Sequence, residues 1–210
     1  MEPEPPNRYK EKDSGAPTAI EIKQWNAFLE TVPLVPTPEE KEFILEHDED
    51  ERGDPAPEEI DQQNRFLLRQ QRHFRVAAVC VADAFAAFTW VEKVAVIGSV
   101  ALPLKQEVPR FYRYRRAHVK LWHECRDVDL AVWVRTLGDL NLLRKAKSRA
   151  LNDLHAATNS AIGTAHHQVD VHMIEDGTDR YLGRLCDFSV CPKGKPECLV
   201  KDCGVHPFLQ

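Results

Sequence analysis

The chain has 210 residues, 43% of them hydrophobic and 29% charged, and a formal net charge of -5. This composition fits a globular domain with a core of its own, and the negative charge excludes a protein that binds polyanions with its whole surface. No apolar run reaches the roughly 18 residues of a membrane span, and residues 1–15 lack the apolar segment of a secretory signal. We therefore expect a cytoplasmic protein with no membrane partner.

The first part of the chain is predicted to be helical after a polar tail. Residues 1–17 are rich in proline and charge, which favours disorder. Residues 18–90 then form a helical N-terminal region. Thr18 is a suitable N-cap for a first helix, and Thr37 for a second, in which Glu40 completes a capping box.

A third and longer helix is predicted from Glu58 to about Trp90. Its first half is amphipathic, whereas its second half contains almost only apolar or small residues. A helix that is apolar all round is usually buried. We therefore expect the second half, with Cys80 and Asp83, to lie in the core.

Residues 91–180 are predicted to form a small mixed α/β core. Short runs of β-branched residues at 94–97, 128–134 and 169–174 predict three strands, the first of them buried. Residues 137–160 have leucines and alanines at helical spacing. The expected fold class is therefore α/β, in the sense of α+β, with a small mixed sheet behind helices.

Three carboxylates lie inside these strand patterns. Asp127 and Asp129 are separated by one residue, so on a strand both side chains face the same side. Neighbouring aspartates repel each other unless a cation lies between them, and aspartate is depleted in strands. Asp170 lies in the third strand, and pairing of the two strands would bring all three carboxylates together. Mg²⁺ is the natural partner of such a set.

The turn after the first strand has the composition of a phosphate-binding turn. Gly98 permits a tight turn, and Ser99 follows it at the start of a short helical segment. Backbone N–H groups and the Ser99 hydroxyl at such a position are able to hold a triphosphate.

The order of these features resembles the nucleotidyltransferase superfamily that includes DNA polymerase beta. The resemblance covers about residues 93–174, and it is carried by Gly98-Ser99 after one strand, Asp127-Val128-Asp129 in a second strand and Asp170 in a later one. Members share a Gly-Ser turn, an Asp-x-Asp pair and a third Asp on a neighbouring strand. Lys105 approximates the basic residue that often follows the turn in this family.

The resemblance implies an enzyme that depends on Mg²⁺ and transfers a nucleoside monophosphate from an NTP to a hydroxyl. The resemblance implies that two Mg²⁺ ions are bound, and catalysis is carried out, by Asp127, Asp129 and Asp170. It implies that the nucleotide, ATP or another NTP, is bound by Gly98, Ser99 and Lys105. The acceptor is not identified, and a protein, an RNA end and a small molecule stay open. The alternative is a non-catalytic interaction or regulatory module that keeps a degenerate form of the same fold.

A basic and aromatic segment separates the turn from the aspartate pair. Residues 108–123 alternate cationic and aromatic side chains, a composition that is able to stack bases and neutralise phosphates. Its position predicts a place near the mouth of the site, where substrate phosphate, RNA or an acidic protein could bind. An exposed strand or hairpin with Phe111, Tyr112 and Tyr114 packed on the body is the alternative.

The last 30 residues, 181–210, form a Cys-rich tail that we expect to bind Zn²⁺. Four cysteines are spaced as C-x4-C-x6-C-x4-C, namely Cys186, Cys191, Cys198 and Cys203. Four thiolates bind Zn²⁺ tetrahedrally in a reducing compartment, and an ion would stabilise a segment too short for a core of its own. An iron–sulfur cluster and free thiols stay open. Cys80 and Cys125 are interpreted as buried thiols. His172 shares a strand face with Asp170 and could touch the substrate or support a metal ligand, but we interpret it as a packed or solvated histidine.

Overall fold

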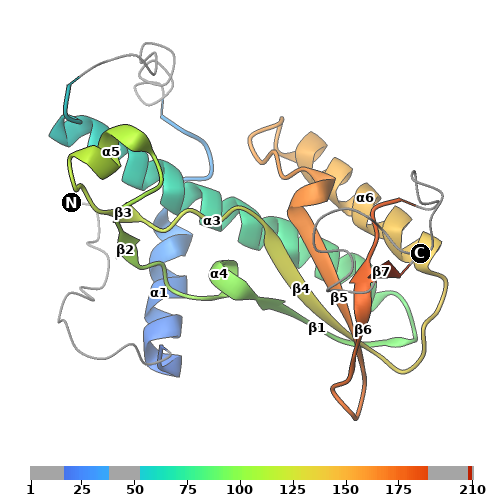
Figure 1. The fold of residues 1–210 in the computed structure, drawn as a ribbon. Coiled ribbons are helices and arrows are strands. Elements are labelled where there is room, and N and C mark those ends of the chain that lie inside the picture. Colours follow the sequence, from blue (N-terminus) through green and yellow to red (C-terminus); the bar gives the residue numbers. More distant parts are fainter. Residues whose placement is uncertain (1–16, 38–52, 189–207, 210) are drawn as a thin grey trace. The chain divides into compact units, whose positions relative to one another are not determined.

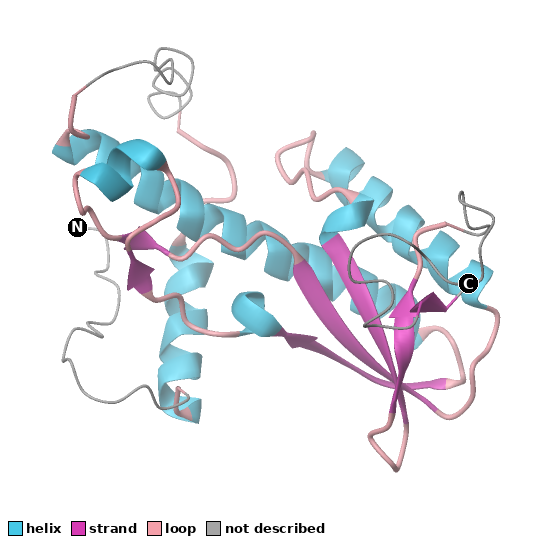
Figure 2. Ribbon diagram, in the orientation of Figure 1, coloured by secondary structure: helices cyan, strands magenta, loops and turns pink. Residues whose placement is uncertain are grey.

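The computed structural model describes residues 17–37, 53–188 and 208–209 (Figures 1 and 2). The chain divides into two compact units, each made of two stretches of sequence. The N-terminal unit comprises Met1–His73 and Leu102–Cys125, and the sheet unit comprises Phe74–Ala101 and Arg126–Gln210. Within the described ranges, none of the helices is both long and apolar enough to cross a bilayer.

The first helix of the N-terminal unit, α1 (Ala19–Thr31), begins where the sequence predicts. Thr18 and Glu21 form a capping box, in which the Thr18 hydroxyl accepts a hydrogen bond from the Glu21 backbone N–H at 3.2 Å. Trp25 and Leu29 are buried on one face of α1. The second predicted helix, which would follow Thr37, lies in residues 38–52, outside the described part of the chain.

Polar bonds inside the N-terminal unit connect its two stretches of sequence. The buried Gln71 accepts a hydrogen bond from the Trp25 indole at 2.9 Å and donates one to the Leu102 carbonyl at 2.7 Å. Residues 102–125 of this unit contain a small antiparallel pair, β2 (Gln106–Glu107) with β3 (Leu121–Trp122), and the short helix α5 (Tyr112–Arg116). Buried hydrogen bonds, as well as apolar packing, therefore hold the two stretches of this unit together.

The long helix α3 (Pro57–Ala86) continues from one unit into the other and ends before Trp90. The prediction that its second half is wholly buried is wrong. Val79 is 57% exposed and Asp83 is exposed, while Cys80 is half-buried. Residues on the buried face recur at helical spacing, namely Phe74, Ala77, Ala78, Val81 and Phe85. Small apolar residues on the other face do not require burial, so the second half is a one-sided helix.

The sheet unit is built on a mixed five-stranded sheet with the order β1-β4-β5-β6-β7. The strands are β1 (Val91–Ile97), β4 (Val128–Val134), β5 (Val169–Glu175), β6 (Tyr181–Leu185) and β7 (Phe208–Leu209). β4 and β5 are parallel and joined through α6 (Leu140–Ala157), whereas β1 pairs antiparallel with β4 and β6 antiparallel with β5. The expected small mixed sheet with helices is confirmed.

The two central strands have one buried and one more open face. Residues of alternate positions are buried on one face, namely Val128, Leu130, Val132, Val134, Val169, Val171 and Met173. Asp129, Asp170 and His172 point to the other face and are half-buried. α6 contributes Leu143 and Leu151 to the core. The acidic residues of β4 and β5 therefore interrupt the apolar pattern only on the face that solvent can reach.

Three predicted segments differ from the observed elements. The 94–97 strand is longer, and among the strands that the structure describes it lies at the edge of the sheet, paired with β4 alone, rather than buried; Ile97 is 39% exposed. α6 begins at Leu140 rather than at Leu137, because the Asp139 carboxylate caps it by accepting bonds from the next backbone N–H groups. β6 lies in the segment assigned to the Cys-rich tail, yet it is a strand of this sheet.

Candidate metal centre

The strand directions bring three chain segments to one edge of the sheet. β4 and β5 are parallel, so their N-terminal ends lie together, and Asp129 pairs in register with Asp170. β1 runs antiparallel to β4, which places its C-terminal Ile97 opposite Asp129. The Gly98 turn therefore reaches the edge where the two aspartates lie.

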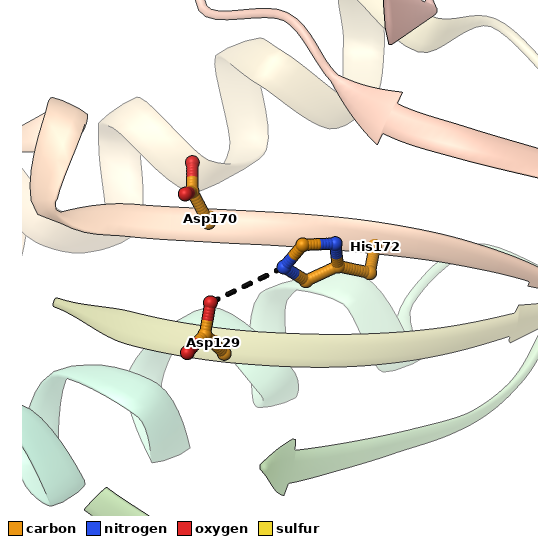
Figure 3. Close-up of side chains that lie close together, drawn as sticks. All are labelled: Asp129, Asp170 and His172. Atoms are coloured by element: carbon orange, nitrogen blue, oxygen red, sulfur yellow. Dashed lines mark hydrogen bonds and ion pairs between the residues drawn. The ribbon is translucent and has the colours of Figure 1, made fainter. Parts of the chain in front are cut away.

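The closest set of potential metal ligands comprises Asp129, Asp170 and His172. One ligand atom of each lies within 4.8 Å of the others. Figure 3 shows the three side chains on the same side of the two strands, with the imidazole directed at Asp129. The His172 Nε2 lies 3.2 Å from Asp129 Oδ1, and the Arg184 guanidinium of β6 donates a hydrogen bond of 2.7 Å to Asp170 Oδ2. Carboxylate oxygens and an imidazole nitrogen thus converge at one point.

Asp127 lies directly before β4 and is electrostatically linked to this set. Burial raises the pKa of its carboxyl group above the ordinary value, and the negative charges of Asp129 and Asp170 raise it further. A nearby Arg126 acts in the opposite direction without cancelling the effect. The third predicted carboxylate is therefore close enough to be repelled by the other two.

Gly98 makes the closest approach of the turn to the carboxylates. Its φ is +72°, a left-handed conformation that residues with a Cβ rarely adopt. A Cβ atom at this position would lie 2.8 Å from Asp129 Oδ2. Glycine is thus required here twice, for the backbone conformation and for the space beside the carboxylate. Ser99 follows in the short helix α4 (Gly98–Ala101).

The roles of the other predicted site residues stay predictions. Lys105 belongs to the N-terminal unit, so its role in binding phosphate stays a prediction. Cys191, Cys198 and Cys203 lie outside the described residues. Cys186 is half-buried at the end of β6, where its backbone N–H donates to the Leu209 carbonyl at 3.0 Å. The zinc site stays a prediction as well.

The remaining cysteine predictions have different outcomes. Cys125 is a buried thiol, as expected. Cys80 is only half-buried on α3, so its predicted burial is not borne out. Burial and the neighbouring Asp83 raise the pKa of the Cys80 thiol, which makes it a poor nucleophile.

The basic and aromatic segment is largely a structural part of the N-terminal unit. Arg113 donates hydrogen bonds to both carboxylate oxygens of Glu59, at 2.8 and 2.9 Å. Arg116 pairs with Asp54, and other bonds of this segment reach backbone carbonyls. Residues 112–116 form α5 rather than a strand, and Tyr112 is exposed. Much of the positive charge is thus balanced within the same unit.

The structure adds two residues to the predicted carboxylates, His172 and Arg184. His172 had a usable signal, because it lies two positions after Asp170 on the same strand face. Arg184 had none, because residues 181–185 were not predicted to be a strand. Alternation along β5 therefore predicts that His172 shares the face of Asp170. The contact of Arg184 with Asp170 depends on the pairing between β5 and β6.

The residues at this edge fit a bound divalent cation. Carboxylate oxygens are the donors that Mg²⁺ and Mn²⁺ prefer, and a cation would relieve the repulsion that raises the pKa of Asp127. No family model, curated protein or solved structure matches this chain.

Proposed function

We propose that the chain is a nucleotidyltransferase of the superfamily that includes DNA polymerase beta. It transfers a nucleoside monophosphate from an NTP to an acceptor hydroxyl. The observation that carries this proposal is the in-register pair of Asp129 and Asp170 on parallel strands, with the Gly98 turn against Asp129. The three segments of the family pattern are far apart in sequence, and an incidental match would not require them to meet at one sheet edge.

The proposed roles come from the family resemblance, and the positions of Asp129, Asp170 and Gly98 support them. Asp127, Asp129 and Asp170 hold two Mg²⁺ ions, which neutralise charge on the reacting phosphate when they are bound. Gly98 and Ser99 hold the triphosphate of the NTP. Asp170 lies at the β6 side of the set and accepts the proton of the acceptor hydroxyl. The acceptor oxygen bonds to the α-phosphorus, the bond from that phosphorus to the β-phosphate breaks, and pyrophosphate leaves.

The test of this proposal uses the full chain and each NTP labelled at the α-phosphate. Reactions contain Mg²⁺ or Mn²⁺ and, as acceptors, the chain itself, RNA oligonucleotides or small polyhydroxylated molecules. We expect label transfer by the native protein, with release of pyrophosphate, and none by Asp129→Asn. The matched control is Asp153→Asn, at an exposed aspartate of α6.

The outcomes separate the two functional classes. Transfer that persists undiminished in Asp129→Asn would overturn the mechanism. Binding of NTP without transfer to any acceptor would favour the non-catalytic regulatory module. Absence of NTP binding in a folded sample would overturn both readings of the site.

We also propose that Cys186, Cys191, Cys198 and Cys203 bind one Zn²⁺ ion in the C-terminal segment. The support is the array of four thiols within a stretch rich in proline and glycine. Metal analysis of reduced, purified protein should find about one equivalent of zinc. Folded protein that carries neither zinc nor iron would refute this site.

A further inference from the structure

His172 occupies a position that the family resemblance does not assign. It lies two residues after Asp170 on β5, on the face that carries both aspartates. In Figure 3 its ring reaches across from β5 toward the neighbouring strand β4, where Asp129 lies. The side chains of Asp129, Asp170 and His172 are 31%, 25% and 25% exposed, so a cation from solvent can reach all three.

We propose that His172 is a direct ligand of the cation, and that the resulting carboxylate–imidazole set selects Mn²⁺ or another first-row transition ion over Mg²⁺. This inference rests on the proposed metal-dependent function. Mg²⁺ prefers oxygen ligands and keeps several waters, whereas an imidazole nitrogen suits transition ions. Replacing one oxygen donor by nitrogen therefore weakens the site for Mg²⁺ relative to its competitors.

The separation of the donor atoms supports coordination. Ligand atoms about 2.1 Å from an ion and at right angles to each other are about 3 Å apart. The distance between His172 Nε2 and Asp129 Oδ1 is 3.2 Å. These two atoms are therefore spaced as neighbouring ligands of one ion, and little movement is needed for both to bind it.

Neighbouring residues hold the imidazole and one carboxylate in place. The ring of Tyr181 on β6 packs against the His172 ring, with 6.2 Å between their centroids. Arg184 Nη1 donates to Asp170 Oδ2, which fixes the orientation of that carboxylate. Such outer contacts orient ligands and tune the affinity of metal sites. The competing role for His172 is to donate a hydrogen bond to Asp129 without touching the ion.

A spectroscopic test separates these roles without measuring activity. The full chain is stripped with a chelator and titrated with Mn²⁺, and pulsed electron paramagnetic resonance then detects nitrogen-14 directly bound to the ion. The variants are His172→Gln, Asp170→Asn and, as a matched control, His167→Gln at an exposed histidine of η1 (His166–Gln168). Competition with Mg²⁺ gives the preference between the two ions.

We expect nitrogen coupling in the native protein and in His167→Gln, and none in His172→Gln. The His172→Gln change should weaken Mn²⁺ binding by about 10- to 100-fold, with a smaller effect on Mg²⁺. The preference for Mn²⁺ should fall accordingly. The native spectrum alone decides whether a nitrogen ligand exists, even if the His172→Gln variant folds poorly.

Each contrary result has a distinct meaning. Mn²⁺ that binds only when Asp170 is present, but without nitrogen coupling, would overturn the role of His172 and leave the proposed function intact. Coupling that survives in His172→Gln would also overturn it. Failure of the native protein to bind Mn²⁺, or binding unaffected by Asp170→Asn, would overturn both the inference and the proposed metal site.

Discussion

The carboxylate of Glu59 in the N-terminal unit and that of Asp127 in the sheet unit meet opposite surroundings. Glu59 is 5% exposed, and it accepts hydrogen bonds from Arg113 and from the Ala56 backbone N–H. Asp127, by contrast, is repelled by two other aspartates. Its partners hold Glu59 in the charged form, whereas the neighbours of Asp127 disfavour its charged form, and a bound cation would remove this difference.

The sheet unit is able to satisfy a buried charge where it serves the fold. Lys147 of α6 is 2% exposed, and its ammonium group donates to the carbonyls of His166 and Val169 and pairs with Asp187. The bond from the Lys147 ammonium group to the Val169 carbonyl fixes the start of β5 directly before Asp170. In the described part of the sheet unit, Lys147 is thus a buried charge with partners, in contrast to the carboxyl group of Asp127.

The largest expected effect is the loss of activity in Asp170→Asn. If the aspartates act on a bound cation, losing one ligand should lower label transfer by about 10²- to 10³-fold, since such charge stabilisation contributes several kcal/mol. An amide has almost the same shape, so the fold should persist, with at most about 2 kcal/mol lost at the bond to Arg184. Transfer rates and circular dichroism of the native protein and the variant measure the two effects. A variant with native activity would place the chemistry elsewhere.

The next effect is on stability, at the satisfied carboxylate. Glu59→Gln removes the charge that faces Arg113, so we expect a loss of about 2 kcal/mol in the free energy of unfolding. Denaturant titration of the full chain measures it. The control is Asp54→Asn, which breaks the exposed pair with Arg116 and should change stability by less than about 1 kcal/mol. Equal effects of the two changes would remove the contrast between the buried and the surface pair.

Gly98→Ala tests the close approach between turn and carboxylate. The left-handed backbone and the contact of a new Cβ with Asp129 Oδ2 should together cost about 1–2 kcal/mol. Label transfer should fall as well, because Asp129 has to move. Gly163→Ala is the matched control, because a Cβ there meets no atom within 4 Å, and its effect should stay within about 0.5 kcal/mol. If both variants behave like the native protein, the turn does not constrain the site.

The sequence predicted the local elements of the site better than their surroundings. The strand at 128–134 has the predicted bounds, and Asp129 and Asp170 meet because alternation and strand pairing act on them directly. Burial was harder to predict, because it depends on which strand lies at an edge. The β-branched run of β1 suits an inner or an outer strand, so its sequence does not distinguish the two.

Residues after Gly177 escaped prediction for a physical reason. β6 contains Gly183 and Arg184 in the short run YLGRL, which lacks a strong strand pattern. This run forms a strand by pairing with β5, and the register of that pairing is irregular at Met173. A single segment does not encode such pairing, so the contact of Arg184 with Asp170 required the structure.

The smallest expected effect has the opposite sign to the others. The raised pKa of Asp127 means that folding disfavours its charged form, so its contribution to stability is present at low pH and is lost as the pH rises through the folded pKa. In metal-free protein Asp127→Asn should therefore be more stable at pH 7, by a few tenths of a kcal/mol after allowance for screening by solvent. The gain should shrink toward pH 3, where the native carboxyl is protonated.

Denaturant titrations across pH, with Asp153→Asn as the control, measure the difference. Added Mn²⁺ should reverse the order, because the cation stabilises the native cluster by binding it. A variant that is less stable than the native protein in metal-free solution would show that Asp127, like Glu59, serves the fold.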